Sequence, residues 1–290
     1  MKKRTRTSLL LLAVAVAVAI GSRYAATDGA PSVRIANGTA AESDAGAALV
    51  RVAVSKEQPY RGNLVLVNKE HAIRKDGVRT DIVALAERPD LLAGAILLAA
   101  DIRMSEDVMR RFADMAEAAR ADGIDRFVVS SGYRTHAEQD ALYAERGAAY
   151  ALPAGHSEHQ LGIALDIGST AGEMAEAEEG RWLARNAWRF GFVLRYPAHK
   201  TDITGIRFEP WHFRYVGLPH SAVMQERDLT LEEYLDLLAE KRQLSVSVGG
   251  KTYGVRYEPY APGMTVSVPE DRPYTLSGDN KGGIIVTSGG

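Results

Sequence analysis

Four side chains in two short clusters have the types and spacing needed to bind a metal ion and to move a proton. His159 and Asp166 lie in the first cluster, and Glu209 and His212 lie in the second. A catalytic zinc site needs three protein ligands and an open position for water, whose pKa the metal lowers. His159, Asp166 and His212 supply these ligands. Glu209 is then left to take the water's proton and pass it to a leaving amine, so the set predicts metal-assisted hydrolysis.

The residue types alone leave an ordinary structural interpretation open. His159 can be a satisfied core histidine, and Asp166 can be a turn or cap residue, because such a pair recurs by chance. The second cluster also makes a geometric demand, since residues three apart on a regular strand face opposite sides. Pro210 cannot donate a ladder hydrogen bond. We therefore expect an irregular or edge segment there, whose kink aims Glu209 and His212 at one ion.

These side chains need rigid elements to hold them, and the hydrophobic pattern predicts several. Ser105 can cap a helix that ends near Gly123, and apolar residues at helical spacing give that helix a core-facing stripe. A buried strand, Phe127–Val129, leads into a polar stretch that ends at Arg134. The other elements expected around the clusters are helices at 136–149, 181–190 and 229–242, and strands at 63–68, 192–196 and 207–216.

The two ends of the chain differ from the middle. Residues 244–290 alternate around Gly249–Gly250 and contain further apolar runs, which predicts a small β-strand appendage. Residues 27–57 are rich in small and polar side chains with little periodicity, so we expect a flexible stalk. The predicted fold class is α+β: a small antiparallel sheet with flanking helices carries the zinc site within residues 58–243, and the β appendage follows.

The first 26 residues have the layout of a membrane anchor or secretory signal. Four basic residues within the first six positions precede an uninterrupted apolar run, Leu9–Ile20. Basic residues hold that end inside, so the remainder of the chain is expected outside the cytoplasm. Cleavage after Gly21 would release the chain. The sequence thus leaves a retained N-terminal anchor and a cleaved signal open.

Composition excludes several classes of protein. The 290 residues carry a formal net charge of −2, so no global basic field attracts nucleic acid or anionic lipid. The absence of cysteine excludes disulfides, thiolate ligands and cysteine nucleophiles. No serine is followed three residues later by lysine, so the S-x-x-K signature of penicillin-binding serine enzymes is missing.

Both clusters resemble motifs of the VanY-type D-alanyl-D-alanine carboxypeptidases, a zinc peptidase group that also includes the VanX-type dipeptidases and the hedgehog signalling domain. S-x-H-x-x-G-x-A-x-D is complete at residues 157–166, and E-x-W-H is complete at residues 209–212. The similarity covers nearly all of the chain beyond the stalk, and it points to the membrane-anchored VanY enzymes of glycopeptide resistance. The additional similar segments are Ser131-Gly132-Tyr133-Arg134 with Gln139, and residues 60–68, 150–155, 214–220 and 244–290.

The resemblance implies a role for each site residue. His159, Asp166 and His212 would bind one Zn²⁺ per chain, and Glu209 would be the catalytic base. Arg134 would stabilise the oxyanion as a charged donor. Ser157 and Gln139 would help to hold the free carboxylate at the substrate's end. No recognised motif position falls on His156, which we interpret as pocket wall or a support for the site.

The implied activity is hydrolysis of the terminal D-Ala from peptidoglycan precursors ending in D-Ala-D-Ala, outside the cytoplasmic membrane, with a contribution to vancomycin resistance. An L,D-carboxypeptidase and a D,D-dipeptidase share the same metal motifs. A non-catalytic, zinc-stabilised wall-binding module is a third alternative. The N-terminal segment argues against a cytosolic dipeptidase, and the presence of Glu209 and Arg134 argues against a binding module. Nothing in the sequence predicts a nucleic-acid partner.

Overall fold

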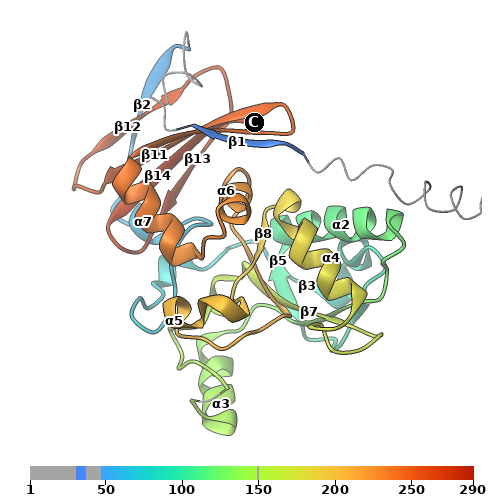
Figure 1. Ribbon diagram of the computed structural model, residues 1–290. Coiled ribbons are helices and arrows are strands. Elements are labelled where there is room, and N and C mark those ends of the chain that lie inside the picture. The colour runs from blue at the N-terminus through green and yellow to red at the C-terminus, as the bar shows by residue number, and fades with distance from the viewer. Residues whose placement is uncertain (1–30, 37–46, 149) are drawn as a thin grey trace, which may run out of the picture. The chain divides into compact units, whose positions relative to one another are not determined.

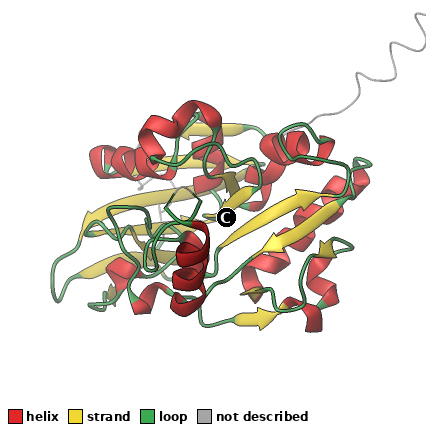
Figure 2. Cartoon of the chain, turned by 90° about the horizontal axis from the view of Figure 1, so that it is seen from below, coloured by secondary structure: helices red, strands yellow, loops and turns green. Residues whose placement is uncertain are grey.

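The computed structural model describes residues 31–36, 47–148 and 150–290 (Figure 1). The described residues of the unit Val33–Gly290 form two five-stranded sheets, two smaller strand pairs and several helices. Helices and strands are mixed (Figure 2), and their order along the chain is not a regular βα alternation, so the predicted α+β class is confirmed.

The sheet that carries the candidate metal ligands has the order β4-β6-β7-β9-β8. Only β4 and β6 pair in parallel, and the remaining pairs are antiparallel. The register between β6 and β7 shifts after Val129, and this irregularity sets Ser131 opposite Asp166. The strands of this sheet are β4 (Ile96–Leu97), β6 (Phe127–Ser131), β7 (Ala164–Ser169), β8 (Phe192–Leu194) and β9 (His212–Tyr215), with the pair β3 (Ile82–Ala84) and β5 (Arg103–Ser105) nearby.

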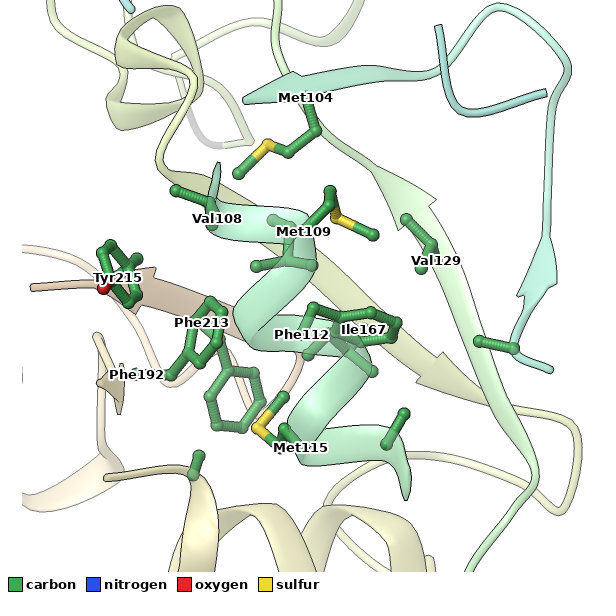
Figure 3. Close-up of a cluster of buried hydrophobic side chains, with 14 of the residues drawn as sticks. Met104, Val108, Met109, Phe112, Met115, Val129, Ile167, Phe192, Phe213 and Tyr215 are labelled. Carbon is green, nitrogen blue, oxygen red and sulfur yellow. The ribbon is translucent and has the colours of Figure 1, made fainter. Parts of the chain in front are cut away.

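Helix α2 (Glu106–Ala121) packs its apolar stripe against this sheet. Ser105 caps it as predicted, because its hydroxyl accepts a hydrogen bond from the Val108 amide. Figure 3 shows Phe112 and Met115 reaching toward Ile167 and Phe213 on the strands. Truncating a buried phenylalanine in such a core costs about 3–5 kcal/mol. The other helices of this part are α3 (His136–Arg146), α4 (Glu178–Asn186) and the short α5 (Thr201–Thr204).

A second sheet, of order β1-β10-β11-β14-β13, is antiparallel throughout. Helices α6 (His220–Glu226) and α7 (Leu231–Lys241) pack on it and share a separate hydrophobic core with it (Figure 1). Its strands are β1 (Val33–Ala36), β10 (Gln243–Val248), β11 (Lys251–Pro259), β13 (Tyr274–Gly278) and β14 (Gly283–Gly289); β2 (Leu49–Ala53) pairs with β12 (Thr265–Pro269) beside it.

The prediction of a flexible stalk at 27–57 was wrong for the residues that the structure describes. β1 pairs with β10, and β2 pairs with β12, so two parts of this segment belong to the C-terminal β structure. These short strands of mixed polarity show no clear periodicity in the sequence. Each is held in a sheet by pairing with a strand near the other end of the chain. Residues 244–290 are accordingly not a separate appendage, since β1 completes their sheet.

The strand predicted at residues 63–68 does not form, although Leu64 to Val67 are all buried. Its backbone groups find partners outside any ladder. The Leu64 amide donates to the Ser277 hydroxyl, the Leu66 amide donates to the Asp279 carbonyl, and the Val65 carbonyl accepts from Arg214. A buried apolar segment satisfied in this way has the composition of a strand without being one.

Within the part of the chain that the structure describes, no helix is long and apolar enough to cross a membrane. The predicted anchor or signal at residues 1–26 lies outside the described residues, so it stays a prediction.

His220 gives the second core a pH-dependent stability. It is buried between the Tyr234 hydroxyl at 2.7 Å and the Thr287 hydroxyl at 3.0 Å, and burial lowers its pKa to about 3. An unfolded histidine titrates near 6.5. Between about pH 3 and 6.5 the unfolded chain therefore binds a proton that the folded chain does not, and stability falls as the pH is lowered through this window, by up to about 1.4 kcal/mol per pH unit.

The His220→Gln variant is expected to lose free energy of unfolding less steeply than the wild type between pH 6.5 and 4.5. Urea unfolding at several pH values measures both slopes. Equal slopes would show that His220 is not held neutral.

Candidate active site

The first cluster and the second meet because β7 and β9 are neighbours in the sheet. Asp166 on β7 and His212 on β9 are register partners. His159 comes from the 3-10 turn Glu158–Leu161, which precedes β7. This turn ends at Gly162 with φ +79°, where a side chain would be strained and would also run into Ile82. The glycine of the motif therefore lets the chain turn back into β7 with His159 facing the sheet.

His159, Asp166 and His212 form a compact group whose ligand atoms lie within 4.8 Å of one another. Asp166 Oδ1 lies 3.4 Å from His159 Nε2 and 3.2 Å from His212 Nδ1. His159 Nδ1 donates to the Gly132 carbonyl at 2.7 Å, which leaves Nε2 to face the group. Ligands about 2.0–2.1 Å from a tetrahedral zinc ion are about 3.3 Å apart, so these spacings suit that ion.

Asp166 supports the same conclusion by its environment. Its Oδ1 is buried and makes no hydrogen bond of normal geometry among the described residues. Burial alone raises the pKa of this carboxyl, but the two histidines hold it well below its ordinary value. A buried carboxylate oxygen without a hydrogen bond is costly unless a cation shares the site. The three residues therefore fit a divalent metal of the zinc type.

Glu209 lies beside this group. Residues 209–211 form a turn before β9, in which the His212 amide donates to the Glu209 carbonyl and the Glu209 amide donates to the Tyr196 carbonyl, each at 3.1 Å. The turn brings Glu209 Oε2 to 3.9 Å from His212 Nδ1, so both side chains face one point, as the sequence argument required. Burial raises the pKa of the Glu209 carboxyl, and the nearby Asp166 raises it further. A raised pKa suits a group that must both accept and return a proton.

The four residues lie in a cavity of about 520 Å³ that is also lined by Arg134, Gln139 and Ser157. Arg134 Nη1 donates to Gln139 Oε1 at 2.8 Å, and Gln139 Nε2 donates to the Leu152 carbonyl at 2.6 Å. Arg134 Nε is buried without a hydrogen-bond partner in the described part of the chain, which leaves a charged donor at the site. Gln139 thus holds Arg134. Direct contact of Gln139 or Ser157 with a substrate stays a prediction.

The sequence argument missed two residues that contact His212. Glu158 is fully buried, and its Oε2 accepts a hydrogen bond from His212 Nε2 at 3.4 Å. The ring of Tyr196 lies 4.9 Å from the His212 ring. The available signal was an arginine beside or within an apolar run, Arg195 directly after Phe192–Leu194 and Arg214 within His212–Tyr215, because a buried arginine requires a buried acid.

His156, by contrast, does not line the cavity. Its Nδ1 donates to the Asn68 carbonyl at 2.8 Å, so it fixes the loop beside the site.

Comparison with known proteins decides the family. Residues 101–218 match the family model described as VanY, D-alanyl-D-alanine carboxypeptidase. The chain is 47% identical over 234 residues to a D-alanyl-D-alanine carboxypeptidase of Enterococcus faecium, and the alignment covers 81% of this chain and 77% of the relative. The chain belongs to the VanY family of D-alanyl-D-alanine carboxypeptidases.

Solved structures agree with this assignment. The vancomycin-resistance D,D-dipeptidase VanXYg, in complex with a D-Ala-D-Ala phosphinate analogue, superposes with a TM-score of 0.73 at 31% identity over 84% of this chain and 100% of that chain. A VanY D,D-pentapeptidase from a VanB-type resistance cassette, in complex with Zn(II), gives 0.50 at 33% identity over 60% of this chain and 98% of that chain. The site predicted for this VanY-family chain lies wholly within the matched residues 101–218, and the second sheet lies outside them.

Removal of one candidate ligand tests directly whether this VanY-family peptidase binds zinc through His159, Asp166 and His212. We expect Asp166→Asn to weaken zinc binding more than about 100-fold, because it removes the buried negative charge shared by both histidines. This exceeds the loss of zinc affinity expected when a residue that only hydrogen-bonds to a ligand is substituted. Competition with a chelator of known affinity measures the change. Asp140→Asn, an equivalent substitution at an exposed position of α3, is the control. Unchanged zinc affinity in Asp166→Asn would exclude Asp166 as a ligand.

Proposed function

We propose that this chain is a zinc-dependent D,D-carboxypeptidase that removes the terminal D-Ala from peptidoglycan precursors ending in D-Ala-D-Ala, and that it contributes in this way to glycopeptide resistance. One observation carries the proposal. Buried Asp166 Oδ1 lies between two imidazole nitrogens and has no hydrogen bond to any residue that the structure describes, and a carboxylate of raised pKa, Glu209, lies beside them in the same cavity. The family to which the chain belongs supports the choice of substrate.

His159, Asp166 and His212 would hold one zinc ion. When bound, the ion supplies Lewis acidity, which polarises a carbonyl oxygen and lowers the pKa of water. In the reaction, the oxygen of water forms a bond to the carbonyl carbon between the two D-alanines, and the C–N bond to the terminal residue breaks. Glu209 accepts the proton of the water and returns it to the departing amine. The Arg134 guanidinium, held by Gln139, stabilises the negative charge on the carbonyl oxygen.

A D,D-dipeptidase acting on free D-Ala-D-Ala is the second candidate. The similarity to VanXYg over 84% of this chain favours it. The two activities differ in whether the site accepts residues on the amino side of the penultimate D-alanine, so substrate length separates them.

The experiment offers the full-length chain three substrates: a pentapeptide ending in D-Ala-D-Ala, the matching tetrapeptide, and free D-Ala-D-Ala. The full chain is needed because β1 and β2 complete the C-terminal β structure. Alanine release from the pentapeptide, abolished by a chelator and restored by zinc, is the expected result. Preference for the dipeptide or the tetrapeptide would change the substrate and keep the site. No turnover by a folded, zinc-loaded chain would refute the enzyme and favour a binding module.

The proposed location is the outer side of the cytoplasmic membrane, with a retained or cleaved N-terminal segment. It is supported by the basic residues that precede the apolar run Leu9–Ile20. Fractionation of bacterial cells that express the chain, followed by protease treatment of intact spheroplasts, tests it. Protection of the chain from external protease would refute the location.

A further inference from the structure

Four charged side chains form a chain of contacts that begins on α7 and ends at His212. Glu232 lies in the first turn of α7, and its carboxylate accepts hydrogen bonds from both terminal nitrogens of Arg195, at 2.7 and 2.8 Å. Arg195 Nε donates to Glu158 Oε1 at 2.9 Å, and Arg214 Nη1 donates to the same oxygen. The side chains of Glu158, Arg195 and Arg214 have no exposed surface, so water does not replace the contacts among these three, and the Glu232 side chain is 15% exposed.

We propose that Glu232 is a positioning residue of the metal site, which acts on His212 through Arg195 and Glu158. This inference rests on the proposed function, in which His212 binds zinc. The two oxygens of Glu158 have different partners. Oε1 accepts hydrogen bonds from Arg195 and Arg214, and Oε2 accepts one from His212 Nε2. A histidine that binds a metal through one nitrogen usually donates its other N–H to such a partner, which fixes both its tautomer and its ring orientation. Here that arrangement keeps Nδ1 of His212 directed at Asp166.

The charge balance explains why Glu232 matters at a distance. Two carboxylates, Glu158 and Glu232, face two guanidinium groups, so the buried set is neutral as a whole. Loss of the Glu232 charge leaves a net positive charge beside His212, in surroundings where water does not screen it. This net positive charge repels a divalent cation and weakens its binding. It also draws Glu158 toward the arginines and away from the imidazole.

A ring contact provides a second route along the same chain. The guanidinium of Arg195 lies 4.9 Å from the centre of the Tyr196 ring, and the Tyr196 ring lies 4.9 Å from the His212 ring. A shift of Arg195 would therefore change the position of His212 through packing as well as through charge. Glu232 lies outside residues 101–218, so the match to the VanY family model does not assign it a role. Through this residue, the helix that packs on the second sheet becomes part of the support of the metal site.

The neighbouring residue provides a matched control. The Glu233 side chain accepts a hydrogen bond from the Thr230 amide and completes the capping box of α7, and it pairs with Lys200 and not with Arg195. Glu233→Ala therefore removes a carboxylate from the same helical turn and weakens the helix without touching the chain of contacts. Glu232→Gln keeps the size and removes the charge.

The test measures zinc affinity of the full-length variants by chelator competition, and the visible spectrum of the Co²⁺-substituted proteins. We expect Glu232→Gln to weaken zinc binding about tenfold, at the lower end of the range for outer partners of a ligand, and to alter the Co²⁺ spectrum. Glu233→Ala is expected to keep wild-type affinity and spectrum. Wild-type affinity in Glu232→Gln, an equal loss in both variants, or a wild-type chain that binds no zinc would overturn the inference.

If Glu232→Gln does not fold, Glu232→Asp replaces it, because it keeps the charge and shortens its reach toward Arg195; the same outcomes decide. Zinc affinity does not depend on turnover. A chain that binds zinc but hydrolyses no substrate refutes the proposed function as an enzyme and leaves this inference intact.

Discussion

The Glu209→Gln variant is expected to lose about 10²–10⁴-fold in kcat while it retains zinc. Glutamine keeps the size of the side chain but cannot accept a proton from water or return it to the leaving amine. Glu209 lies 3.9 Å from His212 and has the raised pKa of a buried carboxyl, which places it beside His159, Asp166 and His212 without being one of these three candidate ligands. Steady-state kinetics with the pentapeptide, together with a zinc assay of the same sample, measures both quantities.

The loss is expected in kcat, with little change in KM, because proton transfer is a contribution made in the transition state. Glu145→Gln, the same substitution at an exposed position of α3, is the control for handling and folding. A kcat near the wild-type value in Glu209→Gln would show that Glu209 does not transfer a proton in the reaction. Loss of zinc together with activity would instead indicate that Glu209 is a zinc ligand.

The Glu158→Gln variant is expected to be less stable than the wild type by about 3–5 kcal/mol, because it leaves buried positive charge without its partner. Glu158 accepts from both Arg195 and Arg214, and these three side chains have no exposed surface. Arg214 cannot turn away, since its Nη2 also donates to the carbonyls of Asn63 and Val65.

Urea unfolding in the presence of a chelator measures this loss without a contribution from metal binding. Glu240→Gln is the control, since Glu240 is exposed and its partner Lys241 is exposed as well, so little change is expected. A Glu158→Gln variant as stable as this control would show that the two arginines are satisfied without the carboxylate.

The grouping of His159, Asp166 and His212 could be predicted from the sequence because its chemistry is local and its spacing is narrow. His159 lies in a 3-10 turn and Asp166 in the strand that follows it, and Glu209 begins a turn that leads directly into His212 of β9, so the local backbone sets the geometry of each pair. The helices with a capping serine or threonine and a regular apolar stripe were also predicted well, α2 and α7 among them, because propensity, caps and burial agree there.

What the sequence did not reveal depends on partners that are remote along the chain. β1 finds β10 more than 200 residues later, so its own composition resembles a linker. Leu64 to Val67 lack a ladder because their partners are Ser277, Asp279 and Arg214. Glu158 was passed over although it precedes a predicted ligand, because nothing near it in sequence reveals the two arginines that bury it.

The start of β1 at Val33 has a consequence for where such an enzyme could work. If residues 1–26 remain in the bilayer, only the six residues 27–32 connect them to the first strand. Six residues reach roughly 20 Å even when fully extended. The start of β1 would then be held close to the lipid surface, which favours lipid-linked precursors emerging there over the outer layers of the wall. Cleavage of the segment would remove that restriction, so the choice between anchor and signal also decides which pool of peptides the site can meet.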